Sequence, residues 1–202
     1  MKKILIGTHN KGKFKEISYL ISKKLRKISP TKLRIISPKE TGKTFISNAR
    51  LKANYFSKFI NYPVISDDSG LCIKSLNNGP GIYSARLAKK KGSFRKAMKY
   101  ILKKMENKKN RSAFFVCSLS YKQPKKKPIT VIGKIFGRVS LKILGNKGFG
   151  YDSIFIPNNE EKTFGQITKY KKIKMDHRYI AFKRLKKKLK LYKFIFSSFV
   201  NI

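Results

Sequence analysis

Acidic side chains are scarce in this 202-residue chain, which has nine aspartates and glutamates against fifty lysines and arginines. The formal net charge of +41 has three competing explanations: binding to nucleic-acid phosphates, binding of small polyanions such as nucleotides, or a composition skewed towards lysine. The basic residues run from Lys2 to Lys193 instead of gathering in one tail or stripe. That distribution favours the skewed composition.

Cysteine and long apolar runs are rare as well. Cys72 and Cys117 lie far apart in apolar runs, without a CxxC motif or a Cys/His cluster, so we expect buried, reduced thiols and no zinc site. The chain has no window of 18 apolar residues and no signal-peptide pattern, and it is expected to be cytoplasmic. We expect one two-lobed domain at residues 1–193 and an apolar tail at 194–202.

Apolar residues in the first third of the chain alternate between short buried runs and helical spacing. Strands are expected at residues 3–8, 33–37 and 63–66, with helices at 13–22 and 44–60. This order of strands and helices favours a layered α/β fold.

The second half contains two long consecutive strand patterns, at residues 112–121 and 129–141, joined by a short turn rich in proline and lysine. Because a short connection suits antiparallel strands, the sheet is predicted to be mixed. Further helices are expected at residues 93–105, with Ser93 as N-cap, and at 177–190.

Two of the nine acids, Asp67 and Asp68, stand side by side in the motif SDDSGL, directly after an apolar run. A strand that ends in acids places them where α/β sheets bind ligands. One or two carboxylates, completed by water and substrate phosphate, are a usual Mg²⁺ site, and Glu40 could approach Asp68. The alternatives are a pair that caps a turn and, for Glu40, a solvated loop acid.

The first strand-to-helix turn, GTHNKGK at residues 7–13, matches the beginning of a P-loop, but Phe14 follows where an orthodox P-loop has serine or threonine. A polar turn that enters a helix offers backbone N–H groups and a positive dipole to phosphate, and Lys13 adds a charge. The alternative is an ordinary connecting turn.

Two later motifs combine residues suited to a nucleobase. The segment GFGYD at residues 148–152 allows close backbone approach and aromatic stacking, or it is simply a turn packed by aromatic rings. At the start of the last helix, Arg178 could grip a purine O6/N7 edge, whereas its alternative is a solvated cation. For His177 the alternative is a surface position.

In type and order these motifs resemble the family of non-canonical purine nucleoside triphosphate pyrophosphatases, also called inosine triphosphate pyrophosphatases or Ham1-like proteins. The resemblance covers residues 4 to about 185. Its blocks are T-x-N-x-x-K at 8–13, E-T-G-x-T-F at 40–45 with N-A at 48–49 and K-A at 52–53, D-D-S-G-L at 67–71, G-P-G-I-Y-S-A-R at 79–86, G-F-G-Y-D at 148–152 and H-R-x-x-A at 177–181.

The resemblance implies an elongated mixed β-sheet flanked by helices, with two lobes around a central cleft, in a homodimer. It implies Mg²⁺-dependent cleavage of ITP, dITP and XTP between the α and β phosphorus atoms, which yields a monophosphate and pyrophosphate. No membrane and no specific nucleic acid are expected as partners.

The same resemblance assigns roles to individual residues. Asp68 would be the general base and, with Glu40, a Mg²⁺ ligand, and Asp67 is offered as a further helper for the metal. The residues that would hold the nucleotide are Thr8, His9, Asn10, Lys11, Gly12, Lys13, Lys52, Ser69, Phe149, Gly150, Tyr151, Asp152, Lys172, His177 and Arg178.

Several positions depart from the family pattern. His9 stands where the family usually has glycine, Ser47 replaces a common glutamate, Ser153 replaces proline and Asp176 replaces serine. These departures concern substrate preference and rate more than the type of reaction. The alternative functions are a basic nucleic-acid-binding protein, motivated by the charge, and a catalytically weakened relative that binds nucleotides.

Overall fold

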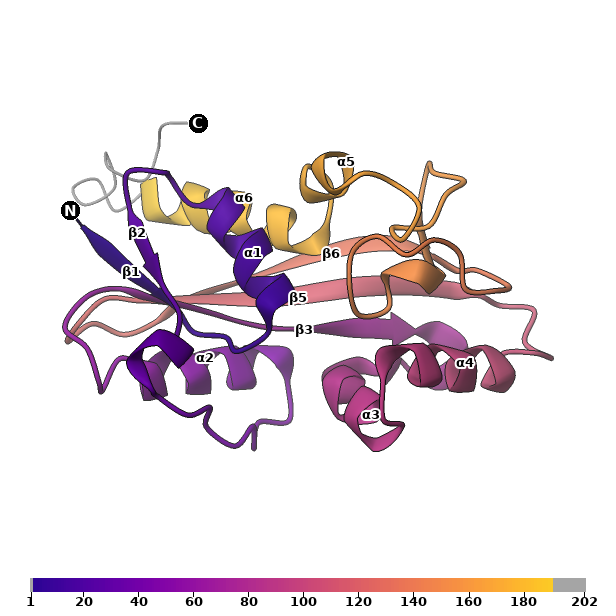
Figure 1. Cartoon of the computed structure of the whole chain (residues 1–202), viewed down its shortest axis with the longest axis horizontal. Helices are drawn as coiled ribbons and strands as arrows, with labels where there is room; N and C mark the ends of the chain where they lie inside the picture. Colours follow the sequence, from indigo (N-terminus) through magenta and orange to yellow (C-terminus); the bar gives the residue numbers. More distant parts are fainter. Residues whose placement is uncertain (1, 191–202) are drawn as a thin grey trace. The chain divides into compact units, whose positions relative to one another are not determined.

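The computed structural model describes residues 2–190, which build a mixed seven-stranded sheet with flanking helices (Figure 1). Strands are β1 (Lys3–Ile6), β2 (Arg26–Ile28), β3 (Val64–Ile73), β4 (Gly79–Pro80), β5 (Ser112–Lys122), β6 (Ile129–Val139) and β7 (Phe155–Pro157). Helices are α1 (Lys11–Leu20), α2 (Phe45–Phe56), α3 (Ser84–Lys90), α4 (Phe94–Lys104), α5 (Lys169–Ile173) and α6 (His177–Lys190). The tail expected at 194–202 lies outside the described residues.

The strand order is β2-β1-β3-β5-β6-β7, with β4 paired to β3. Strand β1 pairs in parallel with β2 and β3, whereas β3 with β4 and β6 with β7 are antiparallel pairs. The predicted mixed α/β sheet is therefore confirmed. Among residues 2–190, no helix has both the length and the apolar character needed to cross a membrane.

The chain divides into two compact units. Among the described residues, unit 1 contains 2–68, 117–133 and 178–190, and unit 2 contains Ser69–Val116 and Lys134–His177. The boundary in β3 falls directly after Asp68, so the predicted site residues are distributed between the units and are described for each unit in turn.

In unit 1 the alternation of side chains along β1 fills two apolar layers. Ile4 and Ile6 pack with residues of α1 and α6, including Ile17, whereas Leu5 packs with Phe56 of α2. Since successive strand residues face opposite sides, α1 and α6 cover one face of this part of the sheet and α2 covers the other (Figure 1). Burial of each such side chain stabilises the fold by roughly 1.5–3 kcal/mol.

The core of unit 2 is rich in aromatic residues. Phe115 of β5 packs edge-on against Phe155 of β7 and beside Phe164, and Ile101 of α4 belongs to the same cluster. Helix α4 begins after Ser93, whose side chain accepts a hydrogen bond from the Lys96 N–H, as predicted. Both cysteines are buried thiols, also as predicted.

The prediction of a strand at residues 33–37 is wrong. The second strand is β2, at Arg26–Ile28, and Thr31–Leu33 form a 3₁₀ turn after Pro30. Strand β2 is at the end of the strand order and pairs with β1 by backbone hydrogen bonds, so its sequence needs few apolar residues and gives a weak pattern. Ile36 in the predicted strand is 75% exposed.

Strand β3 is longer than expected, and this difference matters for the site. The prediction ended it at residue 66, but it continues to Ile73. Asp, Ser and Gly are turn-forming residues, which led to the early stop. Asp67 and Asp68 therefore lie inside a buried ten-residue strand and not beyond its carboxyl end. The short elements α3, α5, β4 and β7 were not predicted.

Candidate active site

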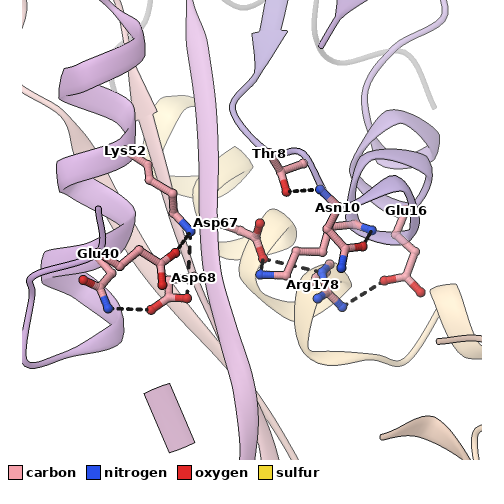
Figure 2. Close-up of polar contacts among 10 residues, drawn as sticks. Thr8, Asn10, Glu16, Glu40, Lys52, Asp67, Asp68 and Arg178 are labelled. Atoms are coloured by element: carbon pink, nitrogen blue, oxygen red, sulfur yellow. Dashed lines mark hydrogen bonds and ion pairs between the residues drawn. The ribbon is translucent and has the colours of Figure 1, made fainter. Parts of the chain in front are cut away.

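The two adjacent aspartates of β3 face opposite sides of the sheet, because side chains alternate along a strand (Figure 2). Ile65 packs in the layer of α1 and α6, and Asp67 follows it by one alternation. Val64 packs in the layer of α2, to which the Asp68 side chain belongs by the same alternation. A single dipeptide thus supplies one carboxylate to each layer of unit 1.

Asp67 belongs to a buried network of four charges. Its Oδ2 is 3.1 Å from Lys13 Nζ and 3.7 Å from Arg178 Nε, and Arg178 Nη1 donates to Glu16 Oε2 at 2.9 Å (Figure 2). Two cations and two anions alternate, which offsets the penalty of burying each charge. Asp67 therefore has two cationic partners in this layer, and its role as a further helper for the metal stays a prediction.

The pKa values of the two aspartates are pushed apart. Burial alone raises the pKa of Asp67, but Lys13, Arg178 and Lys52 outweigh it and lower the pKa to about 2. For Asp68, burial is the largest influence and Glu40 adds to it, so the pKa is raised despite Lys52 and Lys13. Neighbouring carboxyls with opposite shifts are typical of sites where one stays ionised and the other exchanges protons.

Asp68 is held by Asn48 of α2. Asn48 Nδ2 donates to Asp68 Oδ2 at 3.0 Å, while Asn48 Oδ1 accepts from the Gly42 N–H at 2.8 Å. Because a backbone N–H can only donate, this second bond fixes the orientation of the amide. A Cβ at position 42 would lie 2.5 Å from Asn48 Oδ1, so only glycine allows the loop this close.

Lys52, one helical turn after Asn48, connects Asp68 to Glu40. Its Nζ lies 2.6 Å from Glu40 Oε1 and 3.9 Å from Asp68 Oδ1 (Figure 2). Burial would lower the pKa of Lys52, but Asp68, Asp67 and Glu40 together raise it, so this ammonium stays charged. The structure thus brings the predicted Glu40 and Asp68 together.

These residues fit a divalent cation. With both carboxylates ionised, Glu40, Asp68 and Lys52 carry a net charge of −1. Among the described residues there is no cluster of three or more metal-binding side chains, so no all-protein cage is available. Mg²⁺ commonly binds to one or two carboxylates, with water and substrate phosphates as its other ligands, and this pair suits that mode.

The turn at residues 7–13 leads into the N-terminus of α1. Asn10 is the N-cap, and its side chain accepts from the Lys13 N–H at 3.0 Å. The Asn10 N–H is itself held by Thr8 Oγ1 at 3.2 Å (Figure 2). The N–H groups of Lys11 and Gly12 remain in the first helical turn, where the dipole favours phosphate.

Unit 2 gathers a second set of predicted residues around Asp152. Its Oδ2 accepts from Lys172 Nζ at 2.6 Å and from the Phe149 N–H at 2.8 Å. The Lys172 ammonium also lies 4.9 Å from the centroid of the Phe149 ring. Both charged side chains are almost fully buried, so the GFGYD motif and α5 are joined by an ion pair.

Other predicted residues of unit 2 are buried too. The His177 ring stacks on Phe115 with centroids 4.9 Å apart, so its alternative as a surface residue is wrong. The Tyr151 hydroxyl donates to the Ser84 carbonyl at 2.8 Å inside the core, and burial raises the pKa of Tyr151. Ser69 and Gly150 are half-buried. In unit 1, the solvated alternative for Arg178 is wrong as well, because Arg178 is buried.

Gly148 illustrates why the GFGYD motif needs its first glycine. Its φ is +75°, and a Cβ there would lie 2.1 Å from Asp152 Oδ2. Gly148→Ala should lower the free energy of unfolding by about 1–2 kcal/mol from backbone strain and by roughly 1–3 kcal/mol more from the displaced carboxylate. Gly92→Ala is the matched control, since Gly92 has φ +82° and open space around it. Equal losses in urea denaturation of both variants would contradict the contact with Asp152.

Two residues of the site received no role from the sequence. Asn48 and Glu16 orient Asp68 and Arg178 respectively. Asn48 could have been found, because it lies four residues before Lys52 on one face of a predicted helix whose other inward residues are apolar. Glu16 gave no such pattern, since its partner lies 162 residues away in the sequence.

The fold and the site together define an α/β protein with a polar turn that enters a helix and a pair of carboxylates that share a buried lysine. The Ham1 family profile matches residues 4–188, and the chain belongs to this family. It is 42% identical to a dITP/XTP pyrophosphatase of Wigglesworthia glossinidia brevipalpis, over 94% of this chain and 98% of the relative. A dITP/XTP pyrophosphatase of Haemophilus influenzae is 39% identical over 93% and 99%.

Solved structures agree with this assignment. The Ham1 protein of Staphylococcus aureus has a TM-score of 0.84 at 35% identity, over 95% of this chain and 100% of that one. A HAM1 protein from Coxiella burnetii has the same TM-score at 30% identity, with the same coverage. The predicted family and the α/β fold class are therefore confirmed.

Proposed function

We propose that this protein hydrolyses the purine nucleoside triphosphates ITP, dITP and XTP to the monophosphate and pyrophosphate. The relatives named above support the reaction and the substrates. The observation that carries the proposal is the environment of Asp68, a buried carboxyl with a raised pKa between Asn48 and Lys52. A general base works best when its pKa approaches the working pH.

Asp68 is proposed to remove a proton from the attacking water. Asn48 donates to Oδ2, and the other lone pairs of the carboxylate are available to that proton and to a metal ion. The water oxygen bonds to the α-phosphorus, the bond from the α-phosphorus to the bridging oxygen breaks, and pyrophosphate leaves with the electron pair. Lys52 remains charged beside Asp68 and counters the negative charge that builds up on the phosphate oxygens.

The polyphosphate is proposed to lie at the turn of residues 8–13. The N–H groups at the start of α1 and the ammonium of Lys13 provide donors, and Asp67 holds Lys13 in place through their ion pair. Asp67 thus contributes through Lys13 and Arg178 without a direct role in the reaction. Mg²⁺, held by Glu40 and Asp68, would neutralise phosphate charge.

Selectivity for the nucleobase of the substrate is proposed to depend on the group that the purine carries at C6. Hypoxanthine and xanthine carry an oxygen there, which accepts hydrogen bonds from cationic donors such as Lys172 or Arg178. Adenine presents an amino group, so donor would face donor. A buried mismatch of this kind costs about 1–3 kcal/mol, which corresponds to a preference of roughly 5- to 150-fold. A homodimeric state and a cytoplasmic location are further parts of this proposal.

The proposal is tested by measuring pyrophosphate release from ITP, dITP, XTP, ATP and GTP, with and without Mg²⁺. We expect release from the first three nucleotides in the presence of Mg²⁺. Binding of dITP without release would instead favour the catalytically weakened relative. The nucleic-acid-binding alternative gains no support from the relatives, whose names describe nucleotide hydrolysis.

Glu40→Gln tests the metal site. The substitution removes one of the two carboxylates proposed to bind Mg²⁺, so the Mg²⁺ concentration for half-maximal pyrophosphate release should rise by about tenfold or more. Chelation of Mg²⁺ with EDTA should abolish release by the native protein, and added Mg²⁺ should restore it. Glu161→Gln is the control, because Glu161 is exposed in unit 2. An unchanged Mg²⁺ requirement in Glu40→Gln would exclude Glu40 as a ligand.

A further inference from the structure

His9, in the turn proposed to receive the polyphosphate, has partners for both ring nitrogens. Nε2 lies 3.0 Å from the Ile35 carbonyl oxygen, and Nδ1 lies 2.6 Å from Ser37 Oγ. A carbonyl oxygen can only accept, so Nε2 carries the hydrogen of the neutral ring. Nδ1 then accepts from the Ser37 hydroxyl. The two bonds fix one tautomer and attach the turn to residues 35–37.

The segment that receives these bonds leads to Glu40. Residues 34–44 form neither helix nor strand, so their position depends on individual contacts. At one end the Ile35 N–H donates to the Pro30 carbonyl, and His9 binds residues 35 and 37. At the other end the Gly42 N–H is bound to Asn48. Glu40 lies between these two attachments.

The partners of His9 argue against a direct role in binding phosphate. Both nitrogens are engaged by the protein, and the ring also lies near Phe56, at 6.3 Å between centroids. A side chain that binds within its own protein through every polar atom has no donor left for a ligand. The family pattern usually has glycine here, which has no side chain to make such contacts.

We propose that His9 is a positioning residue: through Ile35 and Ser37 it holds the loop that carries Glu40 against the turn that receives the polyphosphate. The inference rests on the proposed function. It replaces the expected contact of His9 with the nucleotide by an indirect role. The turn and the proposed metal ligand Glu40 are then held at a fixed distance from each other, so the polyphosphate and the metal ion keep their relative positions.

Kinetics distinguish the two roles of His9. His9→Ala and Ser37→Ala should each raise the Mg²⁺ concentration for half-maximal pyrophosphate release by about three- to tenfold, with little change in KM for dITP at saturating Mg²⁺. Ser57→Ala is the matched control, because its hydroxyl donates only to the nearby Asn54 carbonyl at the end of α2. If His9→Ala instead raises KM for dITP and leaves the Mg²⁺ requirement unchanged, His9 binds the nucleotide directly and the proposal is overturned.

A double substitution sharpens this test. If His9 acts through Glu40, then His9→Ala should have no further effect on the Mg²⁺ requirement of the Glu40→Gln variant. An undiminished three- to tenfold effect in that background would overturn the proposal. Likewise, the His9→Ala, Ser37→Ala double variant should match the stronger single variant, since both changes break the same attachment.

Nitrogen NMR provides a readout that needs no turnover. The chain has two histidines, so His177→Asn identifies the His9 signals. At alkaline pH we expect the Nε2–H tautomer for His9, and a shift of its Nδ1 signal in Ser37→Ala. Averaged tautomers that do not respond to Ser37→Ala would overturn the attachment. The expected spectra without any pyrophosphate release would instead disprove the proposed function and leave the attachment in place.

Discussion

Asp68→Asn should lower kcat for dITP by about 10²–10⁴-fold, the range expected when a positioned general base is lost. The amide keeps the shape of the side chain but cannot accept a proton at neutral pH. At saturating Mg²⁺, binding of dITP should not weaken, because the change removes a negative charge near a polyanion. Pyrophosphate release measures kcat, and titration calorimetry measures the binding of dITP.

Two controls separate this loss from a general defect. Glu106→Gln removes an exposed carboxylate after α4 and should leave kcat unchanged. The free energy of unfolding of Asp68→Asn should stay close to that of the native protein, since Lys52 keeps Glu40 as a partner. Turnover within threefold of native in Asp68→Asn would rule out Asp68 as the base.

Asp67→Asn should lower the free energy of unfolding by about 3–5 kcal/mol. The change leaves Lys13 and Arg178 with one carboxylate, Glu16, in place of two, and Arg178 is buried. Uncompensated buried charge is strongly unfavourable, and this loss is a large share of the 5–15 kcal/mol typical of a folded domain. Urea denaturation followed by circular dichroism measures the effect.

An ion pair of similar length offers the control for Asp67. Lys171 Nζ lies 2.7 Å from Glu160 Oε1, but the Lys171 side chain is 53% exposed. Glu160→Gln should therefore change the free energy of unfolding by less than about 1 kcal/mol. Comparable losses in Asp67→Asn and Glu160→Gln would show that burial does not set the strength of the Asp67 network.

The sequence identified the residues of the site better than their surroundings. The adjacent acids in SDDSGL drew attention to the buried strand, and the predicted approach of Glu40 to Asp68 is observed, since both carboxylates contact Lys52. The residues of this motif are typical of turns, so the sequence did not indicate that β3 continues through them to Ile73. A strand buried on both faces tolerates such polar residues when neighbouring helices supply their partners. The opposite orientation of Asp67 and Asp68 follows only once that strand is known.

Contacts between distant segments were the least predictable. The strand at 33–37 was favoured by its apolar residues, whereas the true edge strand β2 has a mostly polar sequence. The bonds of His9 to residues 35 and 37 depend on where that segment turns after Pro30, and a local pattern contains no information on this. In contrast, α4 and α6 were predicted close to their observed bounds, since each has a clear apolar face.

The four-charge network has a consequence for how the protein is made. Glu16 and Asp67 leave the ribosome long before Arg178, which is 162 residues behind Glu16. Until α6 has been synthesised, the layer that it shares with α1 lacks both its last cation and the apolar side chains of that helix. A nascent chain that stops short of α6 should therefore lack the complete network and should not hydrolyse nucleotides, so this hydrolase becomes competent only near the end of its own translation.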